Sequence, residues 1–567
     1  MSGRSAADPR TVSIDERVGA LVLRARDSVL RATHRVRPDV ATAVALAALM
    51  IGAAVFLFVE VRPQWFIYDE FDYLAPPVGA SLPGWIIAPH NEHTIVFTKL
   101  WFSTLYNTIG LRGYSLYALP MILCHLAGGL AVFKLLRLVI PSRIIALAAV
   151  APLFFMAAGV GTLTWAGQFQ YTGATAAGLW VLYLAVSPRT THRLWWIVIV
   201  LLGLFGNFSG SAYIPLGVAA GLALLSLGRY VLGVVTVLIP AVWFVLVRLL
   251  WKIPSYNSAH DLGQVLRDGP DFVFGLLNKA INDSIPIDAS FTTAIIVVSS
   301  LGVLAFLARR PTPGGSSRAR RTYLFLLLAL TLSLVITLVG RLSRDLADST
   351  NGGYNYFILI AAIPVFVASI VRFTSGSRIA VGTIVLLLAG WTAIGAAHFD
   401  TSARDLAAWK TSNPALLDGA AYLSLNGFPV ASDAAPSPAQ APTVSWSELQ
   451  AMAAGGKLDP APPATLTADE LSLTMQWTSS TTPASVPTAC EVVEPHSAAS
   501  VSPGVTQLVA TPVPGTTATA GAVLTIQYPT SAASRAVAVA EGGTEITSVV
   551  DRSATLTTGD QAVRLCQ

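Results

Sequence analysis

VATAVALAALMIGAAVFLFVEVRPQWFIYDEFDYL, residues 40–74, joins a long apolar run to a segment rich in carboxylates. The run at 40–59 carries no charge, and roughly 20 apolar residues are enough to cross a bilayer. Asp69, Glu70 and Asp72 follow soon after it. Ionisable groups beside a bilayer are costly and tend to mark places where a substrate or ion is handled. The stretch therefore predicts a membrane-spanning helix with a functional site near its end.

The rest of the chain repeats the apolar half of this pattern. Of its 567 residues, 53% are hydrophobic and only 12% are charged, and the mean hydropathy is +0.61. Apolar runs close to spanning length recur along the chain. We therefore expect an α-helical polytopic membrane protein with about eleven transmembrane helices, at 40–59, 114–133, 144–163, 169–186, 195–210, 212–228, 230–248, 293–308, 323–340, 354–371 and 379–397.

The placement of arginines sets the expected orientation. Six arginines between residues 17 and 37 precede the first run, and others follow the second, fourth, sixth and eighth. Cytoplasmic loops carry such an excess. We therefore expect a multi-pass plasma-membrane protein with a cytoplasmic N-terminus and an external first loop. The arginines lie at span ends and are not interleaved with aromatic residues on a polar face, which argues against a nucleic-acid partner.

Composition divides the chain into four parts, because Ser, Thr, Pro, Ala and Gly dominate beyond residue 398 and short β-prone runs follow. The parts are a cytoplasmic Arg-rich N-terminal segment (1–38), a transmembrane domain (39–398) with an outer loop at 60–113, an extracytoplasmic connector (399–465) and a small β-rich extracytoplasmic C-terminal domain (466–567).

Smaller features fall within these parts. The connector contains two predicted helical pieces, at 403–412 and 446–454, and residues 249–292 are expected to form a long outer loop. Cys124 lies in an apolar run and is most simply a buried thiol. Cys490 and Cys566 lie in the exported region, where pairing is permitted, although spacing alone leaves the disulfide open.

The acidic cluster has the residue types that sugar transfer to a hydroxyl requires. One carboxylate can take the proton of the acceptor while a neighbour orients it or raises the pKa of the base. Adjacent side chains in an irregular segment point to opposite sides, so Asp69 and Glu70 are expected to have different roles, with Asp72 near either. The alternative is a set of ordinary interfacial charges.

A second polar group, His90, Glu92 and His93, follows the acidic cluster. Its spacing does not match a helical zinc motif, so we favour hydrogen bonds to sugar hydroxyls or to a lipid phosphate. A polar turn that caps the next helix is the plainer interpretation. No metal ligand is assigned and no cofactor is certain, although a divalent cation is possible. The amphipathic helix expected at 94–109 contains Lys99 and fits the membrane interface.

Three further segments are predicted to line the outer side. Gln168 and Gln170 stand among aromatic residues and are candidates for sugar contacts, whereas the aromatics themselves can be a membrane belt. Arg341 and Arg344 are expected on the outer side, although most arginines at span ends are expected in cytoplasmic loops. The planar guanidinium of arginine can hydrogen-bond two phosphate oxygens at once. Tyr354 begins the next span and is a further substrate-binding candidate. Surface ion pairs are the competing explanation for the two arginines.

These motifs together resemble the GT-C superfamily of membrane glycosyltransferases, which act on polyprenyl-phosphate sugars. The resemblance is carried by Tyr-Asp-Glu-Phe-Asp-Tyr-Leu (68–74), His-Asn-Glu-His-Thr-Ile-Val-Phe-Thr-Lys-Leu (90–100) and Trp-Ala-Gly-Gln-Phe-Gln (165–170), and it covers about residues 40–400. These motifs are similar to those of a bacterial group of GT-C-like proteins, and the residue usage points to an actinobacterial source.

The resemblance implies an inverting hexosyl- or pentosyltransferase. Asp69 would be the catalytic base, and Glu70 would contact the acceptor or a metal. The donor would be a polyprenyl-phosphate-linked sugar, and the acceptor an envelope glycan, lipid or protein among the membrane lipids. Similar proteins often carry Ser-Arg-Tyr before a late span, whereas residues 349–354 read STNGGY; Arg341 or Arg344 would then hold the phosphate.

Two other classes of function fit parts of the sequence. A transporter or flippase of a lipid-linked envelope precursor would need polar residues at mid-membrane, and His125 is the conspicuous one. A non-catalytic envelope assembly protein would use the C-terminal domain to recruit partners. Replacing Asp69 separates the last from an enzyme, because only an enzyme would lose activity while keeping its fold.

Overall fold

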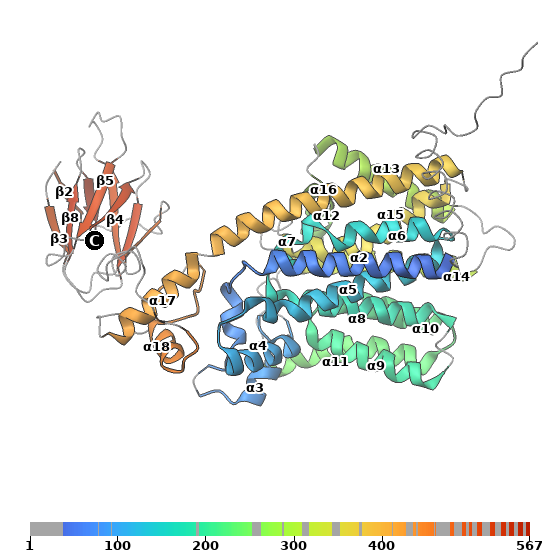
Figure 1. The fold of residues 1–567 in the computed structure, drawn as a ribbon, viewed down its shortest axis with the longest axis horizontal. Helices are drawn as coiled ribbons and strands as arrows, with labels where there is room; N and C mark the ends of the chain where they lie inside the picture. Colours follow the sequence, from blue (N-terminus) through green and yellow to red (C-terminus); the bar gives the residue numbers. More distant parts are fainter. Residues whose placement is uncertain are drawn as a thin grey trace, which may run out of the picture.

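The computed structural model describes most of the chain between residues 38 and 458 and the strands beyond it (Figure 1). The described residues are 38–77, 79–91, 93–188, 192–251, 262–285, 289–308, 317–342, 352–373, 377–410, 412–426, 435–437, 440–458, 460, 477–480, 490–494, 498–501, 507–512, 522–527, 534–539, 544–548, 554–558 and 563–566. The Arg-rich segment 1–37 lies outside them.

Apolar helices account for the described chain up to residue 410. They are α2 (Pro38–Val61), α3 (Leu82–Ile87), α4 (Val96–Ile109), α5 (Tyr114–Val139), α6 (Arg143–Phe154), α7 (Val160–Leu163), α8 (Phe169–Val186), α9 (Arg193–Ser209), α10 (Tyr213–Ser226), α11 (Tyr230–Trp251), α12 (Leu262–Ser284), α13 (Ala289–Ala308), α14 (Ser317–Arg341), α15 (Gly352–Phe373) and α16 (Arg378–Lys410), with 3₁₀ turns η1 (Tyr68–Tyr73), η2 (Ala157–Gly159) and η3 (Ala166–Gln168).

Several of these helices are able to cross a membrane. Within the described residues, five meet the length and hydropathy expected of a span, and a sixth arises if α6 and α7, which meet at 42°, count as one broken span. The helices α9 and α10 are apolar but shorter. The structure thus supports a helical membrane protein, and the number of eleven spans stays a prediction.

Close packing of small residues brings the central helices together. Gly128 of α5 lies against Ala176 of α8, where an added Cβ would find Ala176 Cα at 3.7 Å. Gly129 faces the ring of Phe154, which leaves no room for such a Cβ. Small residues of this kind let helix backbones approach in membranes. Helix α8 consequently packs against both α5 and α10 (Figure 1), and all three helices contribute residues to the buried core.

The structure changes the extent of two predicted segments. Residues 249–292 are not simply a loop, because α12 (Leu262–Ser284) packs against α14, α15 and α16 and buries Phe272 and Leu276. The last span and the helical piece at 403–412 are one helix, α16. No Gly or Pro interrupts it between 397 and 410, and Arg404 donates to Asp400 one turn earlier at 2.6 Å.

The connector packs on the outer loop. Helices α17 (Ser412–Leu425) and α18 (Trp446–Ala454) follow α16, and α18 forms over the predicted residues with a Ser445–Glu448 capping box. Lys457 Nζ donates to the carbonyl of Asn107 at 2.9 Å, and its own carbonyl accepts from the N–H of Leu111. The connector is therefore part of the folded site region.

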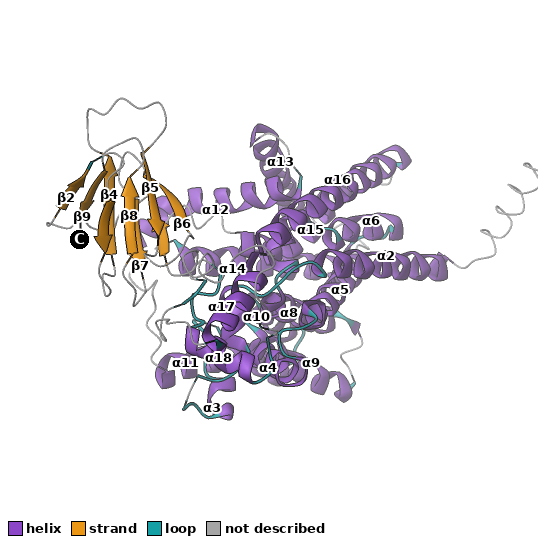
Figure 2. Cartoon of the chain, turned by 60° about the vertical axis from the view of Figure 1, so that its left-hand side comes forward, coloured by secondary structure: helices purple, strands orange, loops and turns teal. Residues whose placement is uncertain are grey.

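The C-terminal strands form two antiparallel sheets (Figure 2). One has the order β1-β7-β4-β9-β2 and the other β3-β8-β5-β6. Their bounds are β1 (Trp477–Ser480), β2 (Cys490–Val493), β3 (Ala498–Val501), β4 (Gln507–Pro512), β5 (Ala522–Gln527), β6 (Ser534–Val539), β7 (Thr544–Ser548), β8 (Ala554–Thr558) and β9 (Val563–Cys566). The β2–β9 register sets Cys490 opposite Cys566. All these strands lie within the predicted range 466–567.

Candidate functional site

The short 3₁₀ helix η1 places the three carboxylates of the acidic cluster in two different environments. A 3₁₀ helix has three residues per turn, so side chains at i and i+3 lie above one another. Asp69 and Asp72 therefore share one face, and Glu70 points into the protein. Tyr68, which opens the turn, has φ +48° and donates its N–H to the carbonyl of Gln440 at 2.7 Å.

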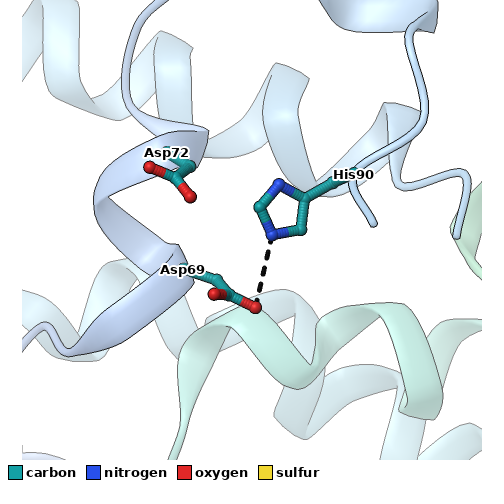
Figure 3. A group of neighbouring side chains, drawn as sticks. All are labelled: Asp69, Asp72 and His90. Atoms are coloured by element: carbon teal, nitrogen blue, oxygen red, sulfur yellow. Dashed lines mark ion pairs between the residues drawn. The ribbon is translucent and has the colours of Figure 1, made fainter. Parts of the chain in front are cut away.

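Asp69 and His90 face each other across the site (Figure 3). The His90 Nε2 and Asp69 Oδ2 atoms are 3.3 Å apart, with 18% and 40% of the respective side chains exposed. Asp72 joins them, because one ligand atom from each of the three residues lies within 4.8 Å of the others. The sequence predicted each of these residues for the site, and the structure brings all three together.

Asp72 is held between the loop and the connector. Burial raises the pKa of its carboxyl above the usual 3.8, while a hydrogen bond from Thr443 and the charge of His90 oppose that rise. A carboxyl whose pKa is raised in this way is easier to protonate than the same group in water. Asp69 is thus accompanied by a second acid that differs from it in environment.

The same three side chains can hold a divalent cation. Two carboxylate oxygens and one imidazole nitrogen are ligand atoms that Mn²⁺ or Zn²⁺ accepts. Asp69, Asp72 and His90 are all partly exposed, which leaves room for further ligands. The arrangement is equally that of a general base held by an imidazole.

A tight turn presents His90 and His93. The N–H of each donates to the carbonyl of the other, at 2.8 and 3.0 Å, and Asn91 between them has φ +50°. Asn tolerates this left-handed conformation better than most residues. Glu92, the third predicted member of the group, lies outside the described residues.

His93 connects the turn to two helices of the bundle. Its Nδ1 lies 3.0 Å from the hydroxyl of Ser211, in the turn between α9 and α10, and its ring meets Tyr171 edge to face at 6.2 Å. The pKa of His93 is lowered to about 4, chiefly by burial and also by the positive charges of Arg341 and His90, while Asp69 opposes the fall. The charges of the predicted base, Asp69, and of the predicted phosphate ligand, Arg341, thus both act on His93.

Glu70 is the centre of a buried hydrogen-bond network. Its side chain is 0% exposed. Oε1 accepts from the Tyr114 hydroxyl at 2.9 Å and from the Gly167 N–H at 2.8 Å, and Oε2 accepts from the Ile67 N–H at 3.0 Å. Burial raises the pKa of Glu70, whereas the charge of Lys410 and these three hydrogen bonds oppose that rise.

Gly167 fits this network because it has no side chain. A Cβ at this position would lie 3.1 Å from Glu70 Cγ and 3.1 Å from Tyr73 Cε2. Its N–H can therefore approach the carboxylate closely. The predicted role of Glu70 in contacting the acceptor or a metal does not suit this position, and a role in holding η1 does.

Lys410 carries the positive charge that acts on Glu70. It is also 0% exposed, donates to the Thr164 carbonyl at 3.0 Å and lies over the Tyr114 ring at 5.9 Å. The charges of Lys410 and Glu70 act on each other. A buried charge is tolerated when such a partner exists, so the end of α16 is tied to η1.

Lys99, predicted to bind substrate, instead holds the outer loop. The residue is 3% exposed, and its ammonium donates to the carbonyls of Trp85 at 2.9 Å and Ala88 at 2.8 Å. These carbonyls lie at the end of α3, where a cation is favoured by the helix dipole. Burial lowers the pKa of Lys99 to about 8, and the Asp72 charge opposes this.

The two glutamines and the late residues have different positions. Gln168 and Gln170 are both buried, and no described group hydrogen-bonds Gln168 Oε1. Arg341 ends α14 with its guanidinium 5.1 Å from the centre of the Tyr354 ring. Arg344 lies outside the described residues. Arg341 thus contacts the ring of Tyr354, and its charge also acts on His93.

One apolar groove lies apart from this cluster. It has a volume of about 330 Å³ and runs between α6 and α16, and none of the predicted site residues lines it. Its lining residues are Ala148, Ala151, Phe155, Val385, Ala389, Thr392, Ala393 and Ala396.

Sequence patterns did not indicate several residues of the site. Tyr114 and Lys410 stand at the ends of apolar helices, where they resemble ordinary boundary residues. Gln440 and Thr443 lie in a Pro- and Ala-rich stretch with no pattern of its own. A lone lysine at the end of a long apolar helix was the one available signal.

No protein-family profile matches this chain, and a search of curated proteins finds no match either.

Proposed function

We propose that this protein is an inverting glycosyltransferase of the GT-C type. It moves a sugar from a polyprenyl-phosphate donor to a cell-envelope acceptor on the outer face of the plasma membrane. The observations that carry the proposal are that Asp69 lies 3.3 Å from His90 and that the charges of Asp69 and Arg341 both act on His93. A base and a phosphate ligand near one another are what the transfer requires.

The reaction follows from these two groups. The acceptor hydroxyl loses its proton to Asp69 while its oxygen bonds to the anomeric carbon of the donor. The bond from that carbon to the phosphate oxygen breaks on the opposite face, and its electron pair leaves with the polyprenyl phosphate. Arg341 balances the charge of the departing phosphate. Inversion at the carbon is the consequence of this in-line geometry.

The remaining residues have supporting roles in this proposal. His90, at 3.3 Å from Asp69, orients the base. Asp72 assists it or, with a bound divalent cation, helps to hold the acceptor. Glu70 is a positioning residue, because its three hydrogen bonds hold the turn on which Asp69 stands.

The orientation belongs to the same proposal. The excess of arginine in alternate loops supports a cytoplasmic N-terminus and an external first loop. The loop, the connector and the C-terminal strands would then be extracytoplasmic, and about eleven helices would cross the membrane.

Release of polyprenyl phosphate tests this function without knowledge of the acceptor. The full chain in lipid nanodiscs would be incubated with undecaprenyl phosphates carrying different sugars and with a cell-envelope fraction. The wild type should consume at least one donor, and Asp69→Asn should lose this activity by about 10²-fold or more. Asp271→Asn, the same change at an exposed acid of α12, is the matched control.

Two outcomes would contradict the proposal. Full activity of Asp69→Asn removes the base from the mechanism. Movement of an intact lipid-linked sugar across the bilayer, with no release of polyprenyl phosphate, would instead identify the flippase that is the main competing function.

A further inference from the structure

Three aromatic rings connect the surroundings of Arg341 to those of His93. The Arg341 guanidinium lies over Tyr354, whose ring meets Phe357 at 6.3 Å and 82°. Phe357 and Tyr171 lie with their rings nearly parallel, at 6.1 Å and 17°. Tyr171 then meets His93 at 6.2 Å. Each distance lies in the range of preferred aromatic pairs.

These rings come from two separate helices. Tyr171 belongs to the first turn of α8, and Tyr354 and Phe357 to the first turns of α15. All three are only partly buried, whereas Tyr356 between them on α15 is fully buried. Tyr356 packs inward and hydrogen-bonds His125 at 3.0 Å. The three other rings therefore form an accessible aromatic surface, which we call the ring shelf.

The proposed reaction determines what must lie between the two ends of this shelf. The anomeric carbon is attacked on one side and releases phosphate on the other. The sugar ring is consequently located between the base near His93 and the phosphate ligand Arg341. The C–H groups on one side of a sugar ring carry slight positive charge, and the face of an aromatic ring carries slight negative charge.

We infer that the ring shelf of Tyr171, Phe357 and Tyr354 binds the apolar face of the transferred sugar and selects among donors by that contact. This inference rests on the proposed function and specifies which part of the donor each group contacts. Arg341 then contacts the phosphate, and the ring shelf contacts the sugar. Bare polyprenyl phosphate uses only the first of these contacts.

Lipid binding by the full chain in nanodiscs, measured by native mass spectrometry, separates the two contacts. The probes are undecaprenyl phosphate and its derivatives carrying mannose, glucose or arabinofuranose. The wild type should bind at least one sugar-bearing lipid about three- to tenfold more tightly than the bare lipid. Phe357→Leu and Tyr171→Leu should each lose that preference and keep the affinity for the bare lipid.

The controls make each outcome decisive. Phe274→Leu, the same change at an exposed ring of α12, should keep the preference, and Arg341→Gln should weaken all four lipids. Unchanged bare-lipid affinity in Phe357→Leu also reports that the variant is folded. If both shelf variants keep the preference, the inference is wrong and the proposed function stands. If the wild type binds none of the four lipids, the proposed donor class is wrong and the inference fails with it.

Discussion

The carboxylates of Asp69 and Glu70 are neighbours in the chain but face opposite surroundings. Asp69 is 40% exposed and lies 3.3 Å from His90, whereas Glu70 is fully buried and accepts hydrogen bonds from Tyr114, Gly167 and Ile67. A single residue of offset on a 3₁₀ turn is enough to separate them. The exposed acid is the one available for chemistry, and the buried acid holds it in place.

Removing Glu70 should destabilise the protein strongly. Glu70→Ala leaves three donors unpaired and Lys410 without its opposite charge, and breaking a buried pair typically costs about 3–5 kcal/mol. Thermal unfolding of the full chain in detergent should show a lower midpoint for Glu70→Ala. Asp69→Asn, which removes no buried contact, should unfold near the wild-type midpoint.

A double variant tests whether Lys410 is the partner. Glu70→Gln and Lys410→Met each leave one buried charge without compensation, so the pair of changes together should cost less than the sum of the two. Strict additivity of the three free energies of unfolding would show that Lys410 and Glu70 do not interact.

Acid should weaken the fold through His93. The pKa of His93 is lowered from 6.5 to about 4 by burial, so the unfolded chain binds its proton first. The stabilising contribution is complete above pH 6.5 and is lost progressively as the pH falls towards 4. His93→Gln removes this titration, and its unfolding midpoint should therefore fall less than that of the wild type between pH 7 and 4.5. An identical pH dependence of the two proteins would exclude His93 as the source.

Lys99 should matter for the outer loop more than for the reaction. Lys99→Met removes two hydrogen bonds to the end of α3, so residues around 82–90 should become more accessible to a protease. Limited proteolysis followed by mass spectrometry would locate the new cleavage. Lys99→Arg keeps a donor and should be cleaved at an intermediate rate. Loss of donor binding in Lys99→Met without faster cleavage would favour a direct contact with substrate.

Cys490 and Cys566 should form a disulfide when the chain is kept under oxidising conditions. They are opposite one another in the β2–β9 register, where Cα atoms of an antiparallel pair are about 4.5–5.5 Å apart, a separation that a disulfide spans. Non-reducing peptide mapping should find the linked peptides. In the chain-entropy account, closing a loop of this length stabilises by about 4–5 kcal/mol, so Cys490→Ser should lower the resistance of the strands to proteolysis. Free thiols at both positions would contradict the pairing.

Local patterns were sufficient for much of the helical part of the chain. Apolar runs located α2, α5 and α14 because each helix must cover its own backbone polar groups in lipid. The helical piece predicted at 446–454 is also present as α18, and the structure shows that it begins with a Ser445–Glu448 capping box. The same reasoning failed for α12, whose polar and apolar residues alternate in a way that looks like a loop until its apolar side is packed against other helices.

The candidate site divides in the same way. Residue types and their nearness in the chain were enough to select Asp69, Asp72 and His90, since all three lie within one loop. No local pattern could reveal that the charge of Lys410 would act on Glu70, 340 positions earlier, or that Tyr171 would lie beside Phe357. Such pairs depend on how α8, α15 and α16 pack, and packing is a property of whole helices rather than of any short stretch of sequence.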